Sequence, residues 1–157
     1  EKLSKKLKIP FERARGIIGQ WHRTFPMGSS FTKRASDVAA ERQWVKTILG
    51  RRARFPDPRW SYRAANRIIQ GSSADILKWK MVEIDRWIEA NNYGQVVQML
   101  LNIHDAILFQ IHKDHLHLIP VIGEMFAAVQ KPPFNLRVPF HADYHVGANW
   151  SIASYGN

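Results

Sequence analysis

Polar and apolar residues alternate with period two along residues 96–111, VVQMLLNIHDAILFQI, and this alternation predicts β-structure. The odd positions from Val97 to Ile111 are apolar except at Asp105. Because the run is long for one strand, we expect a hairpin that turns near His104 and Asp105. A lone carboxylate in an apolar row must be paired, bound to a metal, or placed at the tip of the turn, where it bonds its own backbone.

Helical spacing of apolar residues dominates the first 42 positions. Residues 1–9 predict a short basic helix with Leu3 and Leu7 facing inward, and Pro10 suits the first turn of a second helix. That second helix should end at residues 26–28, and a third, polar helix should cover residues 30–42. The expected buried stripe of the second helix consists of Ile17, Ile18, Trp21 and Phe25.

A short hairpin is expected next, with strands at residues 44–49 and 52–55 and the bend at Gly50. Three of its residues are arginines, namely Arg51, Arg52 and Arg54. The guanidinium group offers a fixed fork of donors, which suits contacts to phosphate. The alternative is a loop whose arginines face only water.

The longest helical pattern covers residues 61–90, with Ser61 as its expected cap. Near its middle, QGSSAD at residues 70–75 places small residues where a ligand or another backbone can approach closely. Asn66 and Gln70 share one face, with Arg63 one turn earlier, so they offer donors to a polar partner or are ordinary surface groups. The expected buried stripe consists of Ala65, Ile69, Leu77, Met81, Ile84 and Ile88, flanked by Ile68, Ile76 and Trp87.

After the central hairpin, Asp114 is expected to cap a helix that runs to about residue 129, and residues 136–144 to form a further strand. The resulting fold class is α+β, a basic helical first part followed by helices on an antiparallel sheet. His112, His115 and His117 invite a metal interpretation, but their spacing fits no common zinc pattern.

The charge distribution points to a polyanionic partner. The chain has 157 residues and a formal net charge of +10; residues 1–60 carry 15 lysines and arginines against five acidic residues, and residues 61–157 carry eight of each. Clustered cations favour nucleic acid before membrane, and the alternative is a solvated basic face without a ligand. There is no cysteine, which excludes disulfides and thiolate metal sites, and no apolar run approaches the roughly 18 residues of a membrane span.

Three stretches stand out by their order and spacing: WVKTILGRRARFPD at residues 44–57, NRIIQGSSADILK at 66–78 and LLNIHDAILF at 100–109. Together they resemble the C-terminal third of family A DNA polymerases, the bacterial DNA polymerase I type. Residues 3–26 look like fingers helices of that family, and the ending DYHVGANWSIA resembles its closing strand and tail, with a phage-like character.

The resemblance implies a partial fingers subdomain with a basic hairpin over residues 1–60, and the C-terminal half of the palm over residues 61–157. It also implies template-directed DNA synthesis, in which a primer 3′-hydroxyl attacks the α-phosphate of a dNTP and pyrophosphate leaves. Family members use two Mg²⁺ ions held by two aspartates, and Asp105 matches one of these. His104 matches the histidine beside the primer terminus, so Asp105 and His104 are the implied catalytic residues.

The same resemblance implies a set of DNA contacts. Asn66 and Gln70 match amides that sense the minor groove of the new base pair, where all correct pairs present common acceptors. The arginine-rich hairpin matches a basic hairpin near the template. The implied DNA-binding residues are Arg51, Arg52, Arg54, Arg63, Asn66, Gln70 and His104.

Two departures from the family pattern limit what the chain is expected to do alone. Ala106 stands where the family usually has glutamate, which removes a carboxylate from the vicinity of the ions. We find neither the strand with the first catalytic aspartate nor the nucleotide-binding helix, and Asp143 matches a different family position. We therefore expect the chain alone to be inactive and to need an N-terminal segment or partner subunit that supplies both. The other expected partners are primer–template DNA and dNTP, with no membrane, in a bacterial nucleoid or a phage-infected cell.

Three alternatives stay open. A single-subunit RNA polymerase also uses a His-Asp turn, although the QGSSAD helix favours the DNA enzymes. A non-catalytic DNA-binding or replisome subunit is favoured by Ala106 and by the missing machinery. A histidine-rich metal hydrolase is the third.

Overall fold

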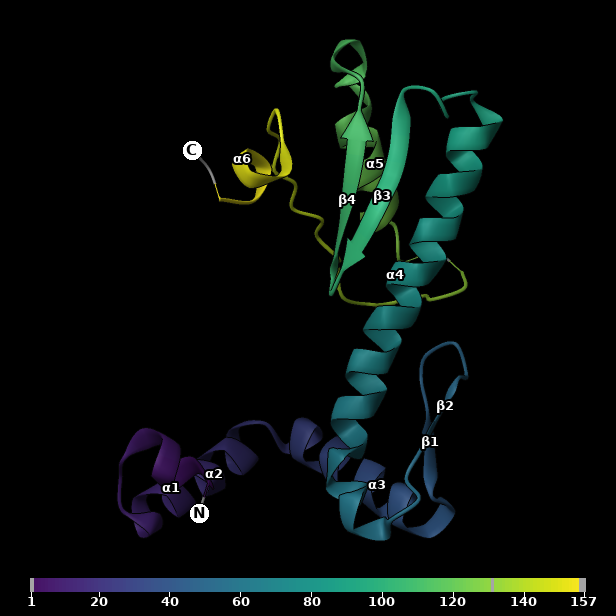
Figure 1. Cartoon of the computed structure of the whole chain (residues 1–157). Coiled ribbons are helices and arrows are strands. Elements are labelled where there is room, and N and C mark those ends of the chain that lie inside the picture. Colours follow the sequence, from purple (N-terminus) through teal and green to yellow (C-terminus); the bar gives the residue numbers. More distant parts are fainter. Residues whose placement is uncertain (1, 131, 156–157) are drawn as a thin grey trace. The chain divides into compact units, whose positions relative to one another are not determined.

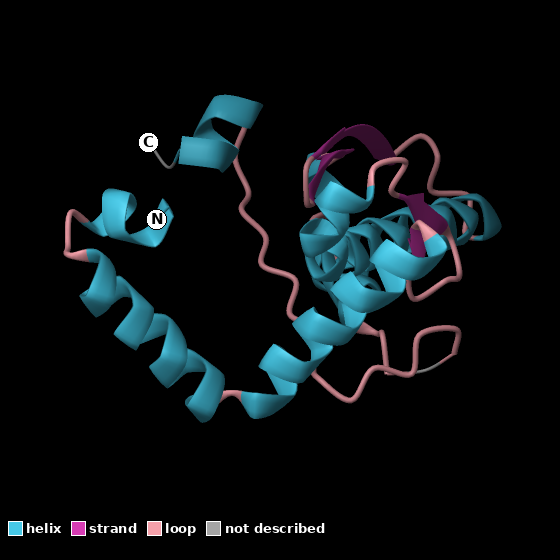
Figure 2. Cartoon of the chain, turned by 90° about the horizontal axis from the view of Figure 1, so that it is seen from below, coloured by secondary structure: helices cyan, strands magenta, loops and turns pink. Residues whose placement is uncertain are grey.

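The computed structural model describes residues 2–130 and 132–155 and has the predicted α+β class (Figure 1). Figure 2 shows that helices dominate. The described strands form two two-stranded sheets. The α-helices are α1 (Lys2–Leu7), α2 (Phe11–Thr24), α3 (Pro26–Arg42), α4 (Ala64–Ala90), α5 (Leu118–Ala127) and α6 (Trp150–Tyr155). The 3₁₀-helices are η1 (Pro58–Arg63) and η2 (Lys113–His115). The strands are β1 (Trp44–Lys46), β2 (Arg52–Arg54), β3 (Val97–Ile103) and β4 (Ala106–Ile111).

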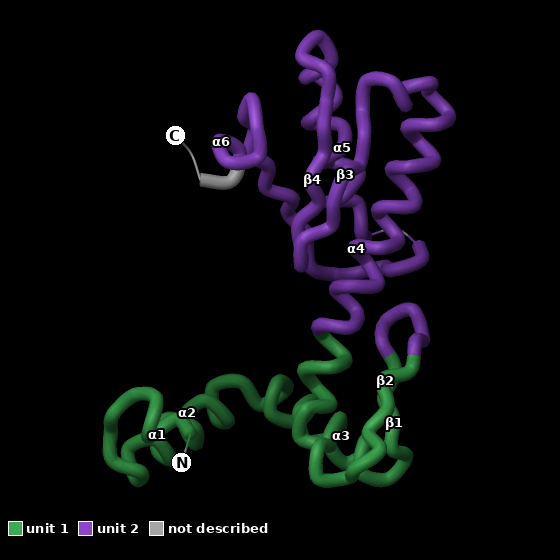
Figure 3. The backbone as a smooth tube through the Cα atoms, in the orientation of Figure 1, with its two compact units in different colours: residues 1–46, 52–69 green, residues 47–51, 70–157 purple. Residues whose placement is uncertain are grey.

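Contacts divide the chain into two compact units, coloured separately in Figure 3. The first comprises residues 1–46 and 52–69, and the second residues 47–51 and 70–157. The tip of the first hairpin therefore belongs to the second unit, and α4 contributes residues to both. The assignment of residues 1–60 to the fingers and 61–157 to the palm stays a prediction. Among the helices described, none has the length and apolar character needed to cross a bilayer.

The core of the first unit is built mainly from small side chains. Ala39 and Ala64 are fully buried, and Val45 of β1 is 3% exposed. Alanines let α3, the β1–β2 hairpin and the start of α4 approach closely, and Phe55 fills the remaining space. The cluster consists of Ala35, Ala39, Val45, Phe55, Ala64 and Ala65.

The first two helices bury less than their spacing predicts. The expected stripe on α2 is wrong, because its four members are between 42% and 54% exposed and Ala14 is the buried residue of that helix. Leu7 is 49% exposed rather than inward. Helix α3 begins at Pro26, earlier than predicted, because proline at the first helical position has no N–H that needs a partner.

Helix α4 is entered through η1 rather than through a serine cap. The Asp57 side chain accepts a hydrogen bond from the Arg59 backbone N–H at 2.9 Å, whereas Ser61 lies inside η1, so the predicted Ser61 cap is wrong. The prediction for Ile69 is also wrong, since it is 61% exposed. Helix α4 ends at Ala90, where the sequence places its stop.

The second unit has a core of larger aliphatic side chains. Ile84 on α4 is fully buried, and Val97 on β3 is 1% exposed. One face of the β3–β4 hairpin packs here against α4 and α5. The buried members are Ile84, Ile88, Val97, Leu118 and Ile122.

A β-bulge interrupts the alternation of the central hairpin. Met99 pairs with Phe109 and Leu101 with Leu108, so Leu100 is an extra residue on β3. An extra residue reverses which face each following side chain takes. The apolar row predicted at the odd positions is therefore broken on β3 beyond the bulge, where Leu101 is 47% exposed. It holds again on β4, where Phe109 and Ile111 pack against the core.

Two predictions for the last third of the chain are wrong. Helix α5 begins at Leu118 because Pro120 fits a first helical turn, and Asp114 lies in η2 instead of capping α5. Residues 136–144 form no strand, since none of the described strands pairs with them. This segment and α5 line a hollow of about 300 Å³, through Pro120, Gly123, Glu124, Ala127, Phe140, His141, Ala142, Asp143 and Tyr144.

Candidate functional site

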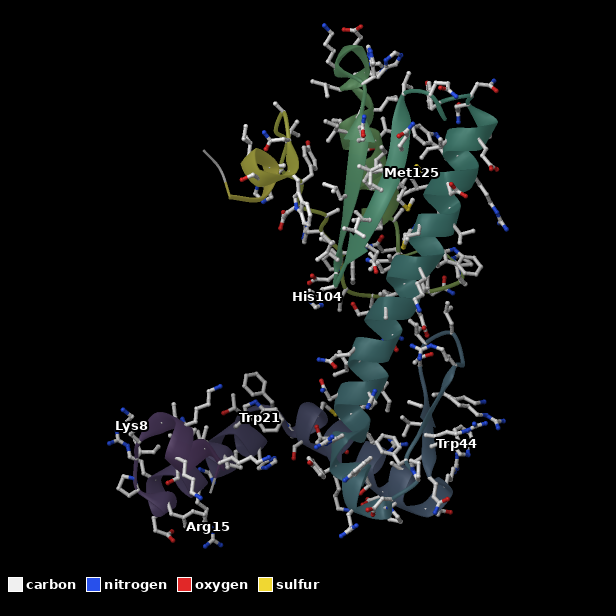
Figure 4. The ribbon with its side chains drawn as sticks, viewed as in Figure 1. Lys8, Arg15, Trp21, Trp44, His104 and Met125 are labelled. Atoms are coloured by element: carbon white, nitrogen blue, oxygen red, sulfur yellow. The ribbon has the colours of Figure 1, made fainter. Side chains whose placement is uncertain are left out.

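His104 and Asp105 form the two-residue loop between β3 and β4, as the alternation predicted, and Ile103 and Ala106 close it as a pair. Figure 4 shows His104 at the end of this hairpin. Its φ of 56° lies in the left-handed region, which tight hairpin turns require but which is uncommon outside glycine. The turn presents the His104 and Asp105 side chains at the exposed tip of the hairpin. The turn is therefore a candidate site.

The Asp105 carboxylate is exposed and, within the part of the chain that the structure describes, accepts no hydrogen bond and forms no ion pair. The turn is bridged instead by Asn102, whose Nδ2 donates to the Ala106 carbonyl at 3.1 Å. Asp105 thus keeps both oxygens available, unlike a turn aspartate that bonds its own backbone. Over residues 2–130 and 132–155, no group of three His, Cys, Asp or Glu residues is arranged to hold a metal ion. Asp105 therefore offers a carboxylate ligand but not a complete metal site by itself.

One face of the β1–β2 hairpin is basic and aromatic. The register places Trp44 opposite Arg54 and Lys46 opposite Arg52, so all four side chains share a face while Val45 packs into the core. The Arg52 guanidinium lies 4.7 Å from the centroid of the Trp44 ring, and the Lys46 ammonium 5.6 Å from it. We call these four residues the basic face. Sequence reasoning missed Trp44 and Lys46, although the alternation in WVK and RAR could have identified them.

A second group of cation and aromatic rings surrounds Arg63. Its guanidinium lies 5.6 Å from the Trp60 ring centroid and 5.4 Å from that of Tyr62, and its Nε donates to the Tyr62 hydroxyl at 3.0 Å. Both aromatic side chains are more than half exposed. The aromatic rings leave the positive charge of this exposed side chain in place. Because they already restrict its conformation, binding to a phosphate costs little additional side-chain entropy.

Arg51 lies apart from the basic face although it is adjacent in sequence. Its Nε donates to Asp75 Oδ1 at 2.7 Å and its Nη2 to the Gly71 carbonyl at 3.0 Å. Asp75 is 7% exposed, and sequence reasoning did not identify it as a partner. Two of the three guanidinium nitrogens of Arg51 are thus engaged within the protein.

The predicted amide pair lies on α4. Asn66 and Gln70 are both exposed and are four residues apart, so they share a helix face. The histidine rings elsewhere form a short chain: the centroids of His112 and His115 are 5.9 Å apart, and those of His115 and His117 5.8 Å.

The candidate residues therefore fall into groups. Arg52 and Arg54 belong to the basic face, and Arg63 has its own aromatic partners. Arg51 is bound to α4, and His104 and Asp105 lie at the tip of the second hairpin.

A sequence model of DNA polymerase family A matches residues 1–152. The chain belongs to this family. The match confirms the resemblance that the three ordered stretches carried.

Family A relatives include DNA polymerase I of Rhizobium leguminosarum, 29% identical over 161 residues, and DNA polymerase DpoZ of Salmonella phage PMBT28, 30% identical over 153 residues. Each alignment covers 96% of this chain but 16% and 24% of the respective relative. The thermostable DNA polymerase I of Thermus aquaticus is 26% identical, over 97% of this chain and 18% of that enzyme. The chain therefore spans about a sixth to a quarter of the length of these polymerases.

A solved structure resembles this fold. It is the POL domain of Pol1 from M. smegmatis in complex with DNA primer-template and dNTP. The TM-score is 0.83 at 27% sequence identity, and the match covers 98% of this chain and 28% of that one.

Proposed function

We propose that this chain is part of a template-directed DNA polymerase that joins a primer 3′-hydroxyl to the α-phosphate of a dNTP and releases pyrophosphate. The observation that carries the proposal is the free, exposed carboxylate of Asp105 on a tight turn of a family A chain. A carboxylate presented in this way can still bind a cation. Asp75, which is buried and already paired with Arg51, cannot serve that purpose.

Asp105 fits a place in a Mg²⁺ site shared with residues outside this chain. Mg²⁺ prefers carboxylate oxygens and keeps waters and substrate phosphates among its ligands, so one or two carboxylates suffice. When bound, a pair of such ions stabilises the attacking and leaving oxygens of the transfer. Asp105 would hold the ions from this chain, and His104 would lie beside the primer terminus. Ala106 adds no carboxylate, so the other acid must come from elsewhere.

The basic and polar groups supply the proposed DNA contacts. Arg52, Arg54 and Arg63 are exposed cations, and they would contact backbone phosphates. Asn66 and Gln70 present amide donors from α4, and they would sense the minor-groove acceptors shared by all correct base pairs.

The chain alone is proposed to be inactive. It spans only a fraction of each relative's length, and the described residues contain no group of three or more His, Cys, Asp or Glu residues that could hold a metal ion. An N-terminal segment or partner subunit would supply the other catalytic aspartate and the nucleotide-binding helix.

Reconstitution tests this function. The full chain is mixed with a polypeptide carrying those two elements, and extension of a labelled primer on a template is followed with and without Mg²⁺. We expect Mg²⁺-dependent extension by the mixture and none by the chain alone. A stable complex that extends no primer contradicts the proposal, and extension with ribonucleotides alone indicates an RNA polymerase.

A second candidate function is a DNA-binding subunit without chemistry. The observation that favours it is Ala106, which begins β4 where the family usually has a glutamate. A complex that binds primer–template DNA with unchanged affinity upon Asp105→Asn substitution, and that extends no primer, would indicate this function.

A further inference from the structure

The tip of the first hairpin, residues 47–51, is fastened to α4 by side chains from both elements. The Arg51 guanidinium reaches Asp75 and the Gly71 carbonyl, and the backbone N–H of Ile48 donates to Ser72 Oγ at 2.9 Å. Within the tip, Thr47 Oγ1 accepts from the Arg51 N–H at 3.1 Å. All of these residues belong to the second compact unit.

The carboxylate at the centre of this network depends on Arg51. Asp75 has a side chain that is 7% exposed, and its Oδ2 is buried without a hydrogen-bond partner. A buried carboxylate is costly unless it is paired, so the Arg51 cation is held where it compensates that charge. Movement of Arg51 toward a phosphate would leave Asp75 unpaired.

Glycine at position 71 allows the close approach. A Cβ at this position would lie 2.8 Å from Thr47 Cγ2 and 3.3 Å from Arg51 Nη2. The first distance is too short for carbon atoms, so a side chain at Gly71 would push the tip away from α4. Within QGSSAD, Gly71 thus accommodates side chains of the tip, and Ser72 binds the backbone N–H of Ile48.

We propose that Arg51, Asp75 and Gly71 form a latch that positions the basic face for DNA, with Arg51 acting as a positioning residue and not as a phosphate ligand. Lys46 and Arg52 directly flank the tip in sequence, so a tip that detaches releases one end of both strands. The proposal rests on the proposed DNA-binding function and assigns different roles to adjacent arginines.

Hydrogen exchange of the full chain tests the latch without DNA. Asp75→Asn keeps the size of the side chain but removes the charge that holds Arg51. We expect the Ile48 amide to exchange about 10- to 100-fold faster, because charged hydrogen bonds that retain the tip are lost. Asp85→Asn, which neutralises an exposed carboxylate on the same helix, is the matched control and should leave that amide unchanged. Unchanged exchange in Asp75→Asn overturns the latch.

A rescue pair tests the contact at Gly71. Gly71→Ala alone should also accelerate exchange at Ile48. Adding Thr47→Ser removes the Cγ2 methyl that the new Cβ would meet and keeps the hydroxyl that binds the Arg51 N–H, so the double variant should return toward the original rate. Failure of Thr47→Ser to restore protection overturns this part of the proposal.

The salt dependence of DNA binding separates the two arginines. Affinity of the full chain for a labelled primer–template duplex is measured over a range of salt concentrations. Loss of one side chain that binds a phosphate reduces the magnitude of the slope of log K against log salt by about 0.9, so Arg52→Gln should reduce that magnitude. Arg51→Gln should weaken binding with the slope unchanged, and a slope lowered as in Arg52→Gln would make Arg51 a phosphate ligand. If the unaltered chain binds no DNA, the proposed function fails, whereas the exchange experiments still decide whether the latch exists.

Discussion

The two hairpins of this chain share a motif and differ in what they expose. The β1–β2 hairpin displays four polar or aromatic side chains, and its tip is bound to α4. The β3–β4 hairpin buries an apolar face against α4 and α5, and its tip carries the exposed carboxylate of Asp105.

This contrast shows that burial determines which side chains two equivalent hairpins leave exposed. Where the strands bury a hydrophobic face, as at Val97, the tip is exposed and carries the Asp105 carboxylate. Where one face of the strands carries charges, as at Arg52 and Arg54, and the other buries only Val45, the tip is hydrogen-bonded to α4. Four substitutions, given in order of decreasing expected effect, test the comparison.

Asp105→Asn should have the largest effect. In the reconstituted polymerase we expect primer extension to fall by more than about 100-fold, since even residues that only hydrogen-bond to metal ligands typically contribute roughly 10–100-fold. Initial rates of extension at saturating DNA measure the change. Asp114→Asn, which neutralises an exposed acid on η2, is the control and should extend primers at the normal rate. Near-normal extension by Asp105→Asn would contradict a catalytic role for the second hairpin.

Ile84→Ala should destabilise the core that anchors the second hairpin. Ile84 is fully buried between α4, β3 and α5, so truncation leaves a cavity and should lower the free energy of unfolding by about 2–5 kcal/mol. Urea unfolding followed by circular dichroism measures it. Ile69→Ala, on the same helix but 61% exposed, should change stability by less than about 0.5 kcal/mol. Equal effects of the two variants would contradict the burial argument.

Arg52→Gln combined with Arg54→Gln should weaken DNA binding without changing stability. Each lost phosphate contact should lower the salt slope by about 0.9, so the double variant should lower it by roughly twice that value. Fluorescence anisotropy with a labelled duplex measures the slope. Arg86→Gln, which removes an exposed charge near the end of α4, should leave the slope as it was, and an equal loss in this control would indicate a general charge effect.

Asp57→Asn should have the smallest effect, and it should depend on pH. The Arg59 side chain, and secondarily its backbone N–H, lowers the pKa of Asp57 from its ordinary value of 3.8. A folded-state pKa below the unfolded one stabilises the fold above about pH 3.8, and this contribution is lost as the pH falls through the lowered pKa. Thermal unfolding should therefore show a slightly lower Tm for Asp57→Asn at neutral pH, with the difference shrinking in acid. A difference that is constant with pH would show that the charge does not stabilise η1.

Much of this protein could be derived from local sequence patterns. Period-two alternation predicted both hairpins and the His104–Asp105 turn, because strand residues face alternate sides whatever surrounds them. Helical spacing predicted α4 and its end at Ala90. The order of three stretches also pointed to the polymerase family, since short motifs in a fixed order are far more specific together than singly.

Only the tertiary structure determines which side chains are exposed and which are engaged in contacts within the protein. A one-residue bulge at Leu100 changed the face of every following side chain on β3, and no local pattern marks that position. The apolar stripe of α2 looks like a core stripe, yet Trp21 is 44% exposed, because burial depends on which elements pack against a helix. Arg51 and Arg52 are neighbours of the same type, but the buried carboxylate of Asp75, 24 residues further along, engages only Arg51. Periodicity is a property of the backbone and can be read locally, whereas pairing depends on residues that the fold brings together.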